Sequence, residues 1–128
     1  MKLLLDTHTF IWWDGEPRCL SRRAAAAIAS PANQVLLSIA SLWEMQIKIA
    51  LHRLKLRKPL ERIVEAQCSE NALEILSIEL PHLWRYNHLP ALHGDPFDRM
   101  LVAQAQAEGA KLVTRDKVFS GYPVEVLW

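Results

Sequence analysis

The feature that most constrains the fold is an apolar run at the start of the chain, Lys2 to Leu5, which stops at an acidic residue, Asp6. A short run that is bounded by polar residues and followed by a helical segment is typical of a central parallel strand covered on both faces. A carboxylate at the C-terminal end of such a strand lies at the edge where open α/β sheets bind ligands. The best candidates for a functional site are therefore the other acidic residues that the fold places at the same edge of the sheet.

Composition indicates one globular domain that covers residues 1–128. Hydrophobic residues make up 51% of the chain and charged residues 23%, which are ordinary values for a folded domain of this size. The longest apolar stretches, such as Ala24 to Ala29, are far shorter than the roughly 18 to 20 residues that a membrane span needs. We therefore expect a cytoplasmic protein that does not contact a membrane. The formal net charge of +1 neither indicates nor excludes binding to nucleic acid.

Predicted strands and helices alternate along the rest of the chain. Short apolar runs predict further strands at residues 34–38, 74–78, 111–114 and 124–127. Capping and periodic patterns predict helices at residues 7–13, 22–29, 41–51, 59–71, 81–88 and 95–109. This alternation, without internal repeats or linkers, predicts a three-layer α/β/α domain with a mainly parallel sheet of about five strands.

Four carboxylates should share one edge of this sheet. Asp6 and Asp116 directly follow predicted strands, and Glu44 and Asp98 stand near the starts of predicted helices. In right-handed βαβ units, helix starts and strand ends lie at the same edge. Four negative charges that converge there would need a cation. Carboxylates without cysteine or histidine companions favour Mg²⁺ or Mn²⁺ over Zn²⁺, and these cations assist phosphodiester hydrolysis.

Each of these carboxylates also has a purely structural interpretation. Glu44 could complete a capping box with Ser41, and Asp98 could complete a similar arrangement with Asp95. Asp95 itself is more typical of a helix cap than of a metal ligand. The two acids at strand ends could be ordinary turn residues. If all of them were structural, the chain would be a non-catalytic protein-interaction module.

The same residues belong to motifs that resemble the PIN-domain ribonucleases of the VapC toxin type, which occur in toxin-antitoxin pairs. The most diagnostic motif is Asp-Pro-Phe-Asp-Arg at residues 95–99. Together the motifs extend over nearly the whole chain, and they are found at residues 4–8, 41–44, 93–105 and 112–116.

This resemblance implies a PIN fold and an endoribonuclease that depends on Mg²⁺ or Mn²⁺, with an RNA substrate. It also implies a cognate antitoxin that masks the active site, and it suggests a homodimer. Carried over by position, Asp6, Glu44 and Asp98 match the core acidic residues that bind metal and carry catalysis. Asp116 matches the more variable fourth acid, and Thr7 matches a hydroxyl residue that would hold a metal-bound water.

Several basic residues and histidines are further candidates near the predicted edge. Arg99 and Arg115 adjoin the proposed ligands, which makes them candidates for phosphate contact. The basic stretch from Lys48 to Arg62 could hold an RNA backbone or could be the solvated face of a helix pair. His8 is not expected to be catalytic. His93 could approach the edge, but we expect it to make hydrogen bonds within its loop.

Other classes of enzyme fit the sequence less well. The four glycines cannot form a P-loop or a GxGxxG motif, which argues against nucleotide binding. A phosphatase with an aspartyl nucleophile is disfavoured because the residue two positions after Asp6 is His8 and not a second acid. The three tryptophans nearest these motifs are expected in the core or in an interface, and they are Trp12, Trp13 and Trp43.

Overall fold

The apolar run at the start of the chain forms the central strand of the sheet, as the sequence predicts. In a computed structural model that describes all 128 residues, Leu3, Leu4 and Leu5 have no exposed surface. This strand pairs in parallel with a neighbour on each side. The five strands are all parallel and lie in the order β3-β2-β1-β4-β5. They are β1 (Lys2–Leu5), β2 (Gln34–Ser38), β3 (Glu74–Leu76), β4 (Lys111–Val113) and β5 (Val126–Leu127).

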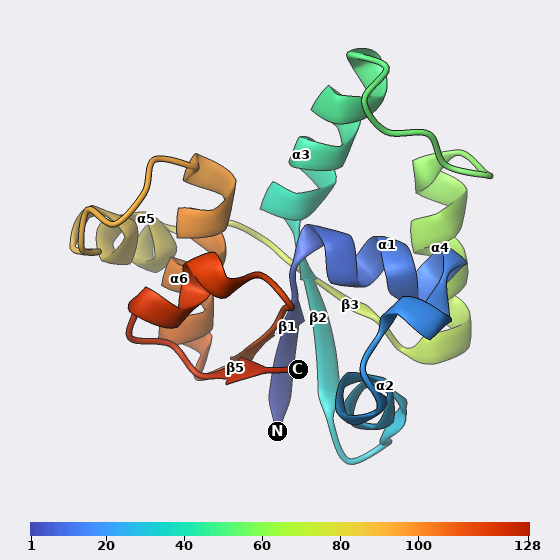
Figure 1. Cartoon of the computed structure of the whole chain (residues 1–128), viewed down its shortest axis with the longest axis horizontal. Coiled ribbons are helices and arrows are strands. Elements are labelled where there is room, and N and C mark those ends of the chain that lie inside the picture. Colours follow the sequence, from blue (N-terminus) through green and yellow to red (C-terminus); the bar gives the residue numbers. More distant parts are fainter.

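Helices cover both faces of this sheet, which confirms the predicted three-layer fold. In Figure 1, α1, α2 and α4 lie on one side of the strands, and α5 and α6 lie on the other. No helix combines the length and the apolar character that crossing a bilayer requires. The helices are α1 (Thr7–Gly15), α2 (Arg22–Ala29), α3 (Ile39–Ala50), α4 (Leu60–Asn71), α5 (Leu80–Asn87) and α6 (Pro96–Glu108), with two 3₁₀ turns, η1 (Pro17–Cys19) and η2 (Lys117–Gly121).

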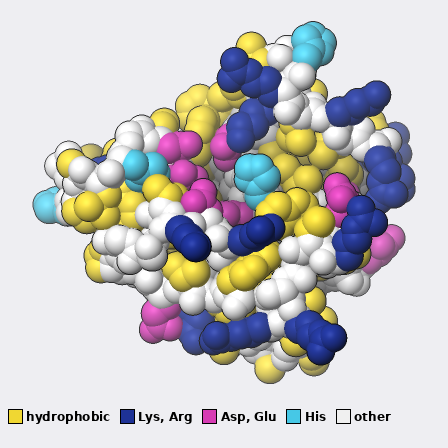
Figure 2. All heavy atoms as spheres, viewed as in Figure 1, with side chains coloured by type: hydrophobic (Ala, Val, Ile, Leu, Met, Phe, Trp, Pro, Cys, Tyr) yellow, Lys and Arg dark blue, Asp and Glu magenta, His cyan; other side chains and the backbone are white.

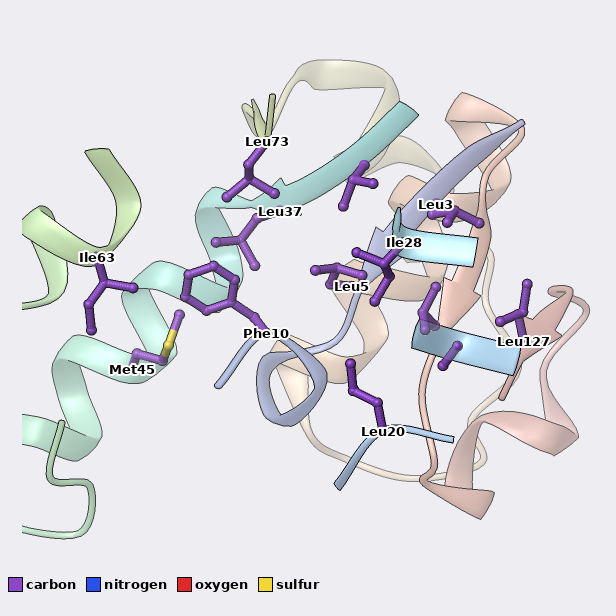
Figure 3. Packing of buried hydrophobic residues seen from close by; sticks show 13 residues of the cluster. Leu3, Leu5, Phe10, Leu20, Ile28, Leu37, Met45, Ile63, Leu73 and Leu127 are labelled. Atoms are coloured by element: carbon purple, nitrogen blue, oxygen red, sulfur yellow. The ribbon is translucent and has the colours of Figure 1, made fainter. Parts of the chain in front are cut away.

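The two faces of the sheet have separate hydrophobic cores because successive side chains of a strand point in opposite directions. Leu3 and Leu5 belong to one core, where they pack with Phe10 of α1 among other residues (Figure 3). Leu4 belongs to the other core, together with Leu101 of α6. The sheet is therefore held from both sides, and its carboxyl edge is fixed relative to the helices that start there.

The junction between β2 and α3 differs from the prediction. The helix begins at Ile39, and its N-cap is Ser38, whose hydroxyl accepts a hydrogen bond from the backbone N–H of Ala40 at 3.0 Å. The prediction that Ser41 caps this helix is therefore wrong. Because the strand passes directly into the helix, the last strand residue takes the capping position, and Glu44 is left free of any capping role.

Some predicted strands are too long by one or two residues. The third strand ends at Leu76 and not at residue 78, because Leu76 pairs with Ser38, the last residue of β2. Beyond that point β2 becomes a helix and offers no partner. The last strand begins at Val126 and not at residue 124, since only residues 126 and 127 pair with β4.

Ser38 joins this junction to α6, and its removal should destabilise the fold. Its buried hydroxyl also donates to Oε1 of Gln104, which has no exposed surface. Replacing Ser38 by alanine removes the cap and leaves a buried amide oxygen without its donor. We expect the free energy of unfolding in urea to fall by about 1 to 3 kcal/mol. The exposed Ser69 of α4 is the control, because Ser69→Ala should change it by less than about 0.5 kcal/mol.

Candidate active site

Asp6 lies buried at the end of β1, where its carboxylate joins two other segments. Oδ1 accepts a hydrogen bond from the backbone N–H of Thr9 at 2.7 Å, which makes Asp6 the N-cap of α1. Oδ2 accepts a short hydrogen bond from the hydroxyl of Thr114, directly after β4. Asp6 is therefore structural as well as suitably placed for chemistry, and the two interpretations of this acid are compatible.

Glu44 lies in the second turn of α3, with only 9% of its surface exposed. Its Oε1 accepts a hydrogen bond of 2.6 Å from the hydroxyl of Thr7, the residue that follows Asp6. Its Oε2 lies 3.0 Å from Nζ of Lys48, one helical turn later. These contacts place Glu44 beside the end of β1 and give its negative charge one cationic partner.

Asp98 lies in the first turn of α6 and does not cap it. The cap is Asp95, whose Oδ1 accepts from the backbone N–H groups of Phe97 and Asp98 at 2.9 and 3.1 Å, as predicted. The carboxylate of Asp98 instead has Oδ2 3.3 Å from Nε2 of His93. The suggestion that Asp98 completes a capping arrangement is therefore wrong, and its side chain is available for another role.

The electrostatic setting of Asp98 disfavours its charged form. The pKa of Asp98 is raised from 3.8 to about 6, and burial is the largest cause of this increase. The negative charges of Asp95 and Glu44 add to the increase in this pKa, whereas the hydrogen bond with His93 acts against it. The contribution of Glu44 to this increase indicates that the fold brings Glu44 and Asp98, which are 54 positions apart in the sequence, to the same region.

Asp116 is exposed at the rim of this region. Its Oδ1 accepts from the backbone N–H of Val118 at 3.0 Å, so that it caps η2. Its backbone N–H donates at 3.0 Å to the hydroxyl of Thr114, which in turn donates to Asp6. One threonine thus connects the first and fourth acids, and Asp116 has the turn role that the structural interpretation predicted.

The four acids are connected through hydroxyl groups and through charge around the carboxyl edge of the sheet. Figure 2 shows acidic side chains gathered near the middle of this face, over the region where α1, α3 and α6 begin in Figure 1. Carboxylates offer the hard oxygen donors that Mg²⁺ and Mn²⁺ prefer. In the present conformation, no three side chains of the acidic, histidine or cysteine types are arranged to hold one metal ion together. Metal binding by these four residues therefore remains a prediction.

The other predicted site residues lie around this acidic region in different settings. The half-buried side chain of Arg99 makes hydrogen bonds to other parts of the protein. Its Nη1 donates to the carbonyl of Pro90 at 2.8 Å and to the hydroxyl of Tyr122 at 3.1 Å. Arg115 is exposed next to Asp116. Their predicted contact with phosphate stays a prediction.

His8 and the three tryptophans lie partly at the surface and partly against the core. His8 is exposed and packs its ring against Trp12 at a centroid distance of 5.8 Å. Trp12 and Trp13 pack against the core, as predicted. Trp43 is 58% exposed and contacts the ring of Phe97 at 5.2 Å, so it lies at the surface and is available to an interface.

The basic stretch from Lys48 to Arg62 runs from the last turn of α3 through a loop into α4. Most of its basic side chains are exposed, and Figure 2 shows Lys and Arg side chains spread over this part of the surface. Only Lys48 forms a salt bridge, the one with Glu44. The rest of the stretch is solvated in the free protein, which agrees with one of its two interpretations and leaves the other untested.

Sequence reasoning missed two residues that contact this region. Thr114 lies within a motif, but its role as a bridge was not foreseen, and its hydroxyl at a strand end is the only signal that pointed to it. Tyr122 follows η2 and its hydroxyl lies 2.6 Å from Nδ1 of His93. Nothing in the sequence near Tyr122 indicates this contact, because it depends on how the C-terminal segment returns across the edge.

Comparison with known proteins gives a consistent result. The family described as the PIN domain matches residues 3–125 of the chain. The chain is also similar to "Ribonuclease VapC22" of Mycobacterium tuberculosis, with 29% identity over 122 residues that make up 90% of this chain and 87% of that protein.

Solved structures of similar fold include two VapBC structures with bound DNA and one toxin-antitoxin complex. VapBC2 from Rickettsia felis, bound to a DNA fragment from its promoter, has a TM-score of 0.75 and 20% identity, covering 98% of this chain and 97% of that chain. DNA-bound VapBC from Salmonella typhimurium has a TM-score of 0.68 and 18% identity, with coverage of 98% and 96%. A toxin-antitoxin complex from Klebsiella pneumoniae has a TM-score of 0.58 and 25% identity, with coverage of 94% and 92%.

Removing the charge of Asp98 should stabilise the protein in the absence of metal. Because its pKa is about 6 in the folded chain and near 3.8 in the unfolded chain, native stability falls as pH rises through this interval and stays low above it. Above this interval, Asp98→Asn should raise the free energy of unfolding by about 1 to 2 kcal/mol, less than the full pKa shift because water partly screens the carboxylate. Below it the difference should vanish.

Denaturation in urea at several pH values measures this difference. Glu70→Gln, at an exposed position of α4, is the matched control and should leave stability nearly unchanged at every pH. A loss of stability in Asp98→Asn above the interval would mean that the native charge is already compensated within the protein.

Proposed function

The chain belongs to the PIN-domain family, and from that premise we propose that it is an endoribonuclease that hydrolyses RNA phosphodiester bonds with Mg²⁺ or Mn²⁺. We further propose that it is the toxin of a toxin-antitoxin pair and that it acts in the cytoplasm, where its RNA substrate is found. The similarity to a protein named Ribonuclease VapC22 supports the activity. The similarity to a toxin-antitoxin complex and to two VapBC structures supports the biological setting.

The observation that carries this proposal is the surplus of negative charge at the carboxyl edge of the sheet. Asp6, Glu44, Asp95 and Asp98 lie around this edge, and the charges of Asp95 and Glu44 contribute to the raised pKa of Asp98. Lys48 is the only lysine or arginine in a salt bridge with any of them. Partly buried carboxylates that lie near one another repel when no cation is bound, and a divalent cation would offset this repulsion.

The proposed ligands are Asp6, Glu44, Asp98 and Asp116. All of them supply oxygen and none supplies sulfur, which fits Mg²⁺ or Mn²⁺. When bound, such a cation neutralises charge on the phosphodiester and lowers the pKa of water.

The protein's own groups prepare the site for this chemistry. Thr7 donates to Oε1 of Glu44 and thereby fixes the orientation of that carboxylate. In the proposed mechanism, Glu44 completes the metal site or accepts a hydrogen bond from the attacking water. The N-termini of α1 and α6 meet the same edge, and their partial positive charges favour a phosphate group there.

RNA would reach this edge past exposed basic side chains. Arg115 lies at the rim next to Asp116, and the basic stretch from Lys48 to Arg62 extends from the same region along α3 and α4. Contacts with phosphate groups supply most sequence-independent affinity for nucleic acid. We therefore assign these side chains to the RNA backbone and not to the choice of base.

A partner that masks the acidic edge completes the proposal. One of the similar structures named above is a toxin-antitoxin complex, and two others are VapBC structures with bound DNA. We propose a cognate antitoxin for this chain, whose contact with the acidic edge would include positively charged groups, because only these would compensate the charges there.

A non-catalytic interaction module is the second candidate. It is favoured by one observation, that Asp6, Asp95 and Asp116 each cap a helix or a 3₁₀ turn. In that case the acids would serve the fold alone, and a cation would bring no added stability. The two candidates therefore differ in measurable ways.

Substitution of the central acids should abolish cleavage without unfolding the chain. Asp6→Asn keeps the oxygen that caps α1, and Asp98→Asn removes a charge that opposes folding. We expect each to lower the rate of RNA cleavage in Mn²⁺ by more than about 100-fold, since even groups outside the first coordination shell contribute up to that factor. Cleavage of total cellular RNA, mapped by sequencing, is the measurement.

The control is Asp14→Asn, at the opposite end of α1, where the side chain accepts from Gln67 and has no contact with the edge. This variant should cleave like the native chain. Full activity of Asp6→Asn or Asp98→Asn would refute the assignment of these acids.

Mn²⁺ should stabilise the protein if the nuclease proposal is correct. At a hundred times its Kd, a ligand that binds only the folded state adds about 2.7 kcal/mol to the free energy of unfolding. This gain should appear as a higher melting temperature in the native chain and should be largely lost in Asp6→Asn. Equal melting temperatures with and without Mn²⁺ would favour the interaction module.

An exposed apolar surface supports a homodimer. On α5, Leu80, Leu83 and Trp84 are 61%, 43% and 62% exposed, and Trp43 of α3 is 58% exposed. A groove of about 270 Å³ lies between α3, α5 and α6, and seven of its eight lining residues are hydrophobic. An apolar area of this kind is typical of contact between proteins. We propose that a second copy of the chain covers it.

A charge placed on this surface should separate the two copies. Trp84→Glu should shift the molecular mass in solution, measured by light scattering after gel filtration, from dimer to monomer. Ala26→Glu adds the same charge at an exposed position of α2, in the opposite helical layer, and should leave the mass unchanged. A monomeric native chain would refute this part of the proposal.

A further inference from the structure

The carboxylate of Asp98 is one end of a chain of hydrogen bonds that leads to the C-terminal segment. Its Oδ2 lies 3.3 Å from Nε2 of His93, and Nδ1 of the same ring lies 2.6 Å from the hydroxyl of Tyr122. That hydroxyl accepts at 3.1 Å from Nη1 of Arg99. Four side chains from the loop before α6, from α6 itself and from the segment after η2 are thus connected in one line.

Arg99 determines the direction of every hydrogen bond in this line, because its side chain can only donate. Arg99 has no acceptor, so it donates to the oxygen of Tyr122. The hydroxyl of Tyr122 then has its own hydrogen to give to Nδ1 of His93. A neutral His93 with an acceptor at Nδ1 carries its proton on Nε2, which points at Asp98. Each hydrogen along the line has one acceptor, and the last of them is donated by Nε2 of His93 to the carboxylate of Asp98.

Arg99 and Tyr122, which lie beyond His93 in this line, are both fixed within the protein. Arg99 is also bonded to the carbonyl of Pro90 at 2.8 Å and lies 5.1 Å from the ring centre of Tyr86. Tyr122 is only 4% exposed. A side chain at Gly121 would come within 3.0 Å of Leu92, so the loop that carries His93 packs tightly on the segment that carries Tyr122. The imidazole has little freedom to turn away.

We propose that His93 is a positioning residue for Asp98, and that Tyr122 and Arg99 hold it in the tautomer that this role needs. The inference rests on the proposed nuclease function, for which Asp98 is a ligand and His93 is not. Fixing a ligand carboxylate by a hydrogen bond from a second residue is a general way to raise both metal affinity and activity. The C-terminal segment thereby becomes part of the machinery of the site.

A role for His93 in loop structure alone would not account for this arrangement. The loop is already attached to α6 by the bond between Arg99 and Pro90 and to η2 by the contact between Leu92 and Gly121. Neither of these contacts requires a ring nitrogen that faces Asp98. The added feature is the contact from Nε2, and this contact is the one to test.

Substitution of His93 by glutamine or by asparagine tests the roles of its two ring nitrogens separately, because the two amide side chains differ in length. The amide nitrogen of glutamine reaches about as far as Nε2, so His93→Gln keeps a donor for Asp98. The shorter amide of asparagine reaches only about as far as Nδ1, so His93→Asn loses it. We expect His93→Asn to lower both the affinity for Mn²⁺, measured by calorimetry, and the rate of RNA cleavage by about 10- to 100-fold. His93→Gln should restore most of both.

Tyr122→Phe is a second variant, which keeps the buried ring and removes the hydroxyl. It should also weaken Mn²⁺ binding and cleavage, by less than His93→Asn. His88→Asn and His88→Gln are matched controls at an exposed histidine whose ring is hydrogen-bonded to the backbone carbonyl of Trp84, and both should behave like the native chain. Melting temperatures measured for every variant identify any loss of folding.

Nitrogen NMR spectra of the imidazole rings test the arrangement independently of activity. At a pH above the ordinary pKa of histidine, His93 should carry its proton on Nε2, and Tyr122→Phe should produce a mixture of both tautomers. A proton on Nδ1, or folded variants His93→Asn and Tyr122→Phe with native Mn²⁺ affinity and cleavage, would overturn the inference. A native chain without Mn²⁺ binding or cleavage would instead refute the proposed function, and the spectra would still decide whether this line of hydrogen bonds exists.

Discussion

The buried carboxylate of Asp6 is the interaction on which the rest of the structure depends. One oxygen fixes the start of α1, and the other accepts from Thr114 after β4. The backbone N–H of Asp6 donates to the carbonyl of Val113, which continues the pairing of β1 with β4. A single residue thus ends the central strand, starts a helix and binds a neighbouring strand. The edge of the sheet is rigid at the place where the proposed chemistry occurs.

The rigid edge brings negative charges together, and their repulsion destabilises the protein when no cation or partner is bound. Thr7 and Lys48 offset the charge of Glu44, and His93 partly offsets that of Asp98. The balance is incomplete, because the pKa of Asp98 remains raised. Groups that serve a ligand need not stabilise the protein without it, and active sites often contain groups with shifted pKa values for this reason. In this chain, burial accounts for the largest part of the shift and neighbouring charge for the rest.

Much of the fold followed from the sequence, whereas the detail of the site did not. The spacing of apolar residues and the cap at Asp95 predict the sheet and its helices because these signals are local. The N-cap of α3 was misplaced by three residues, because Ser41 has Glu44 three positions later, as a capping box requires, whereas Ser38 has no such residue. Only the end of β2 identifies Ser38 as the cap. The link from His93 to Tyr122 could not be foreseen, because the C-terminal segment follows no regular period and its path is set by packing.

The pairing of β1 with β4 has a consequence for synthesis of the protein. Asp6 and Thr114 are 108 positions apart, so the first strand leaves the ribosome long before its partner is translated. Until then the middle of the sheet has one open side, and neither the last two strands nor the line from Tyr122 to Asp98 can form. Non-local pairing of this kind delays folding. A nascent chain therefore cannot assemble the acidic edge of the sheet until the residues after β4 have been translated.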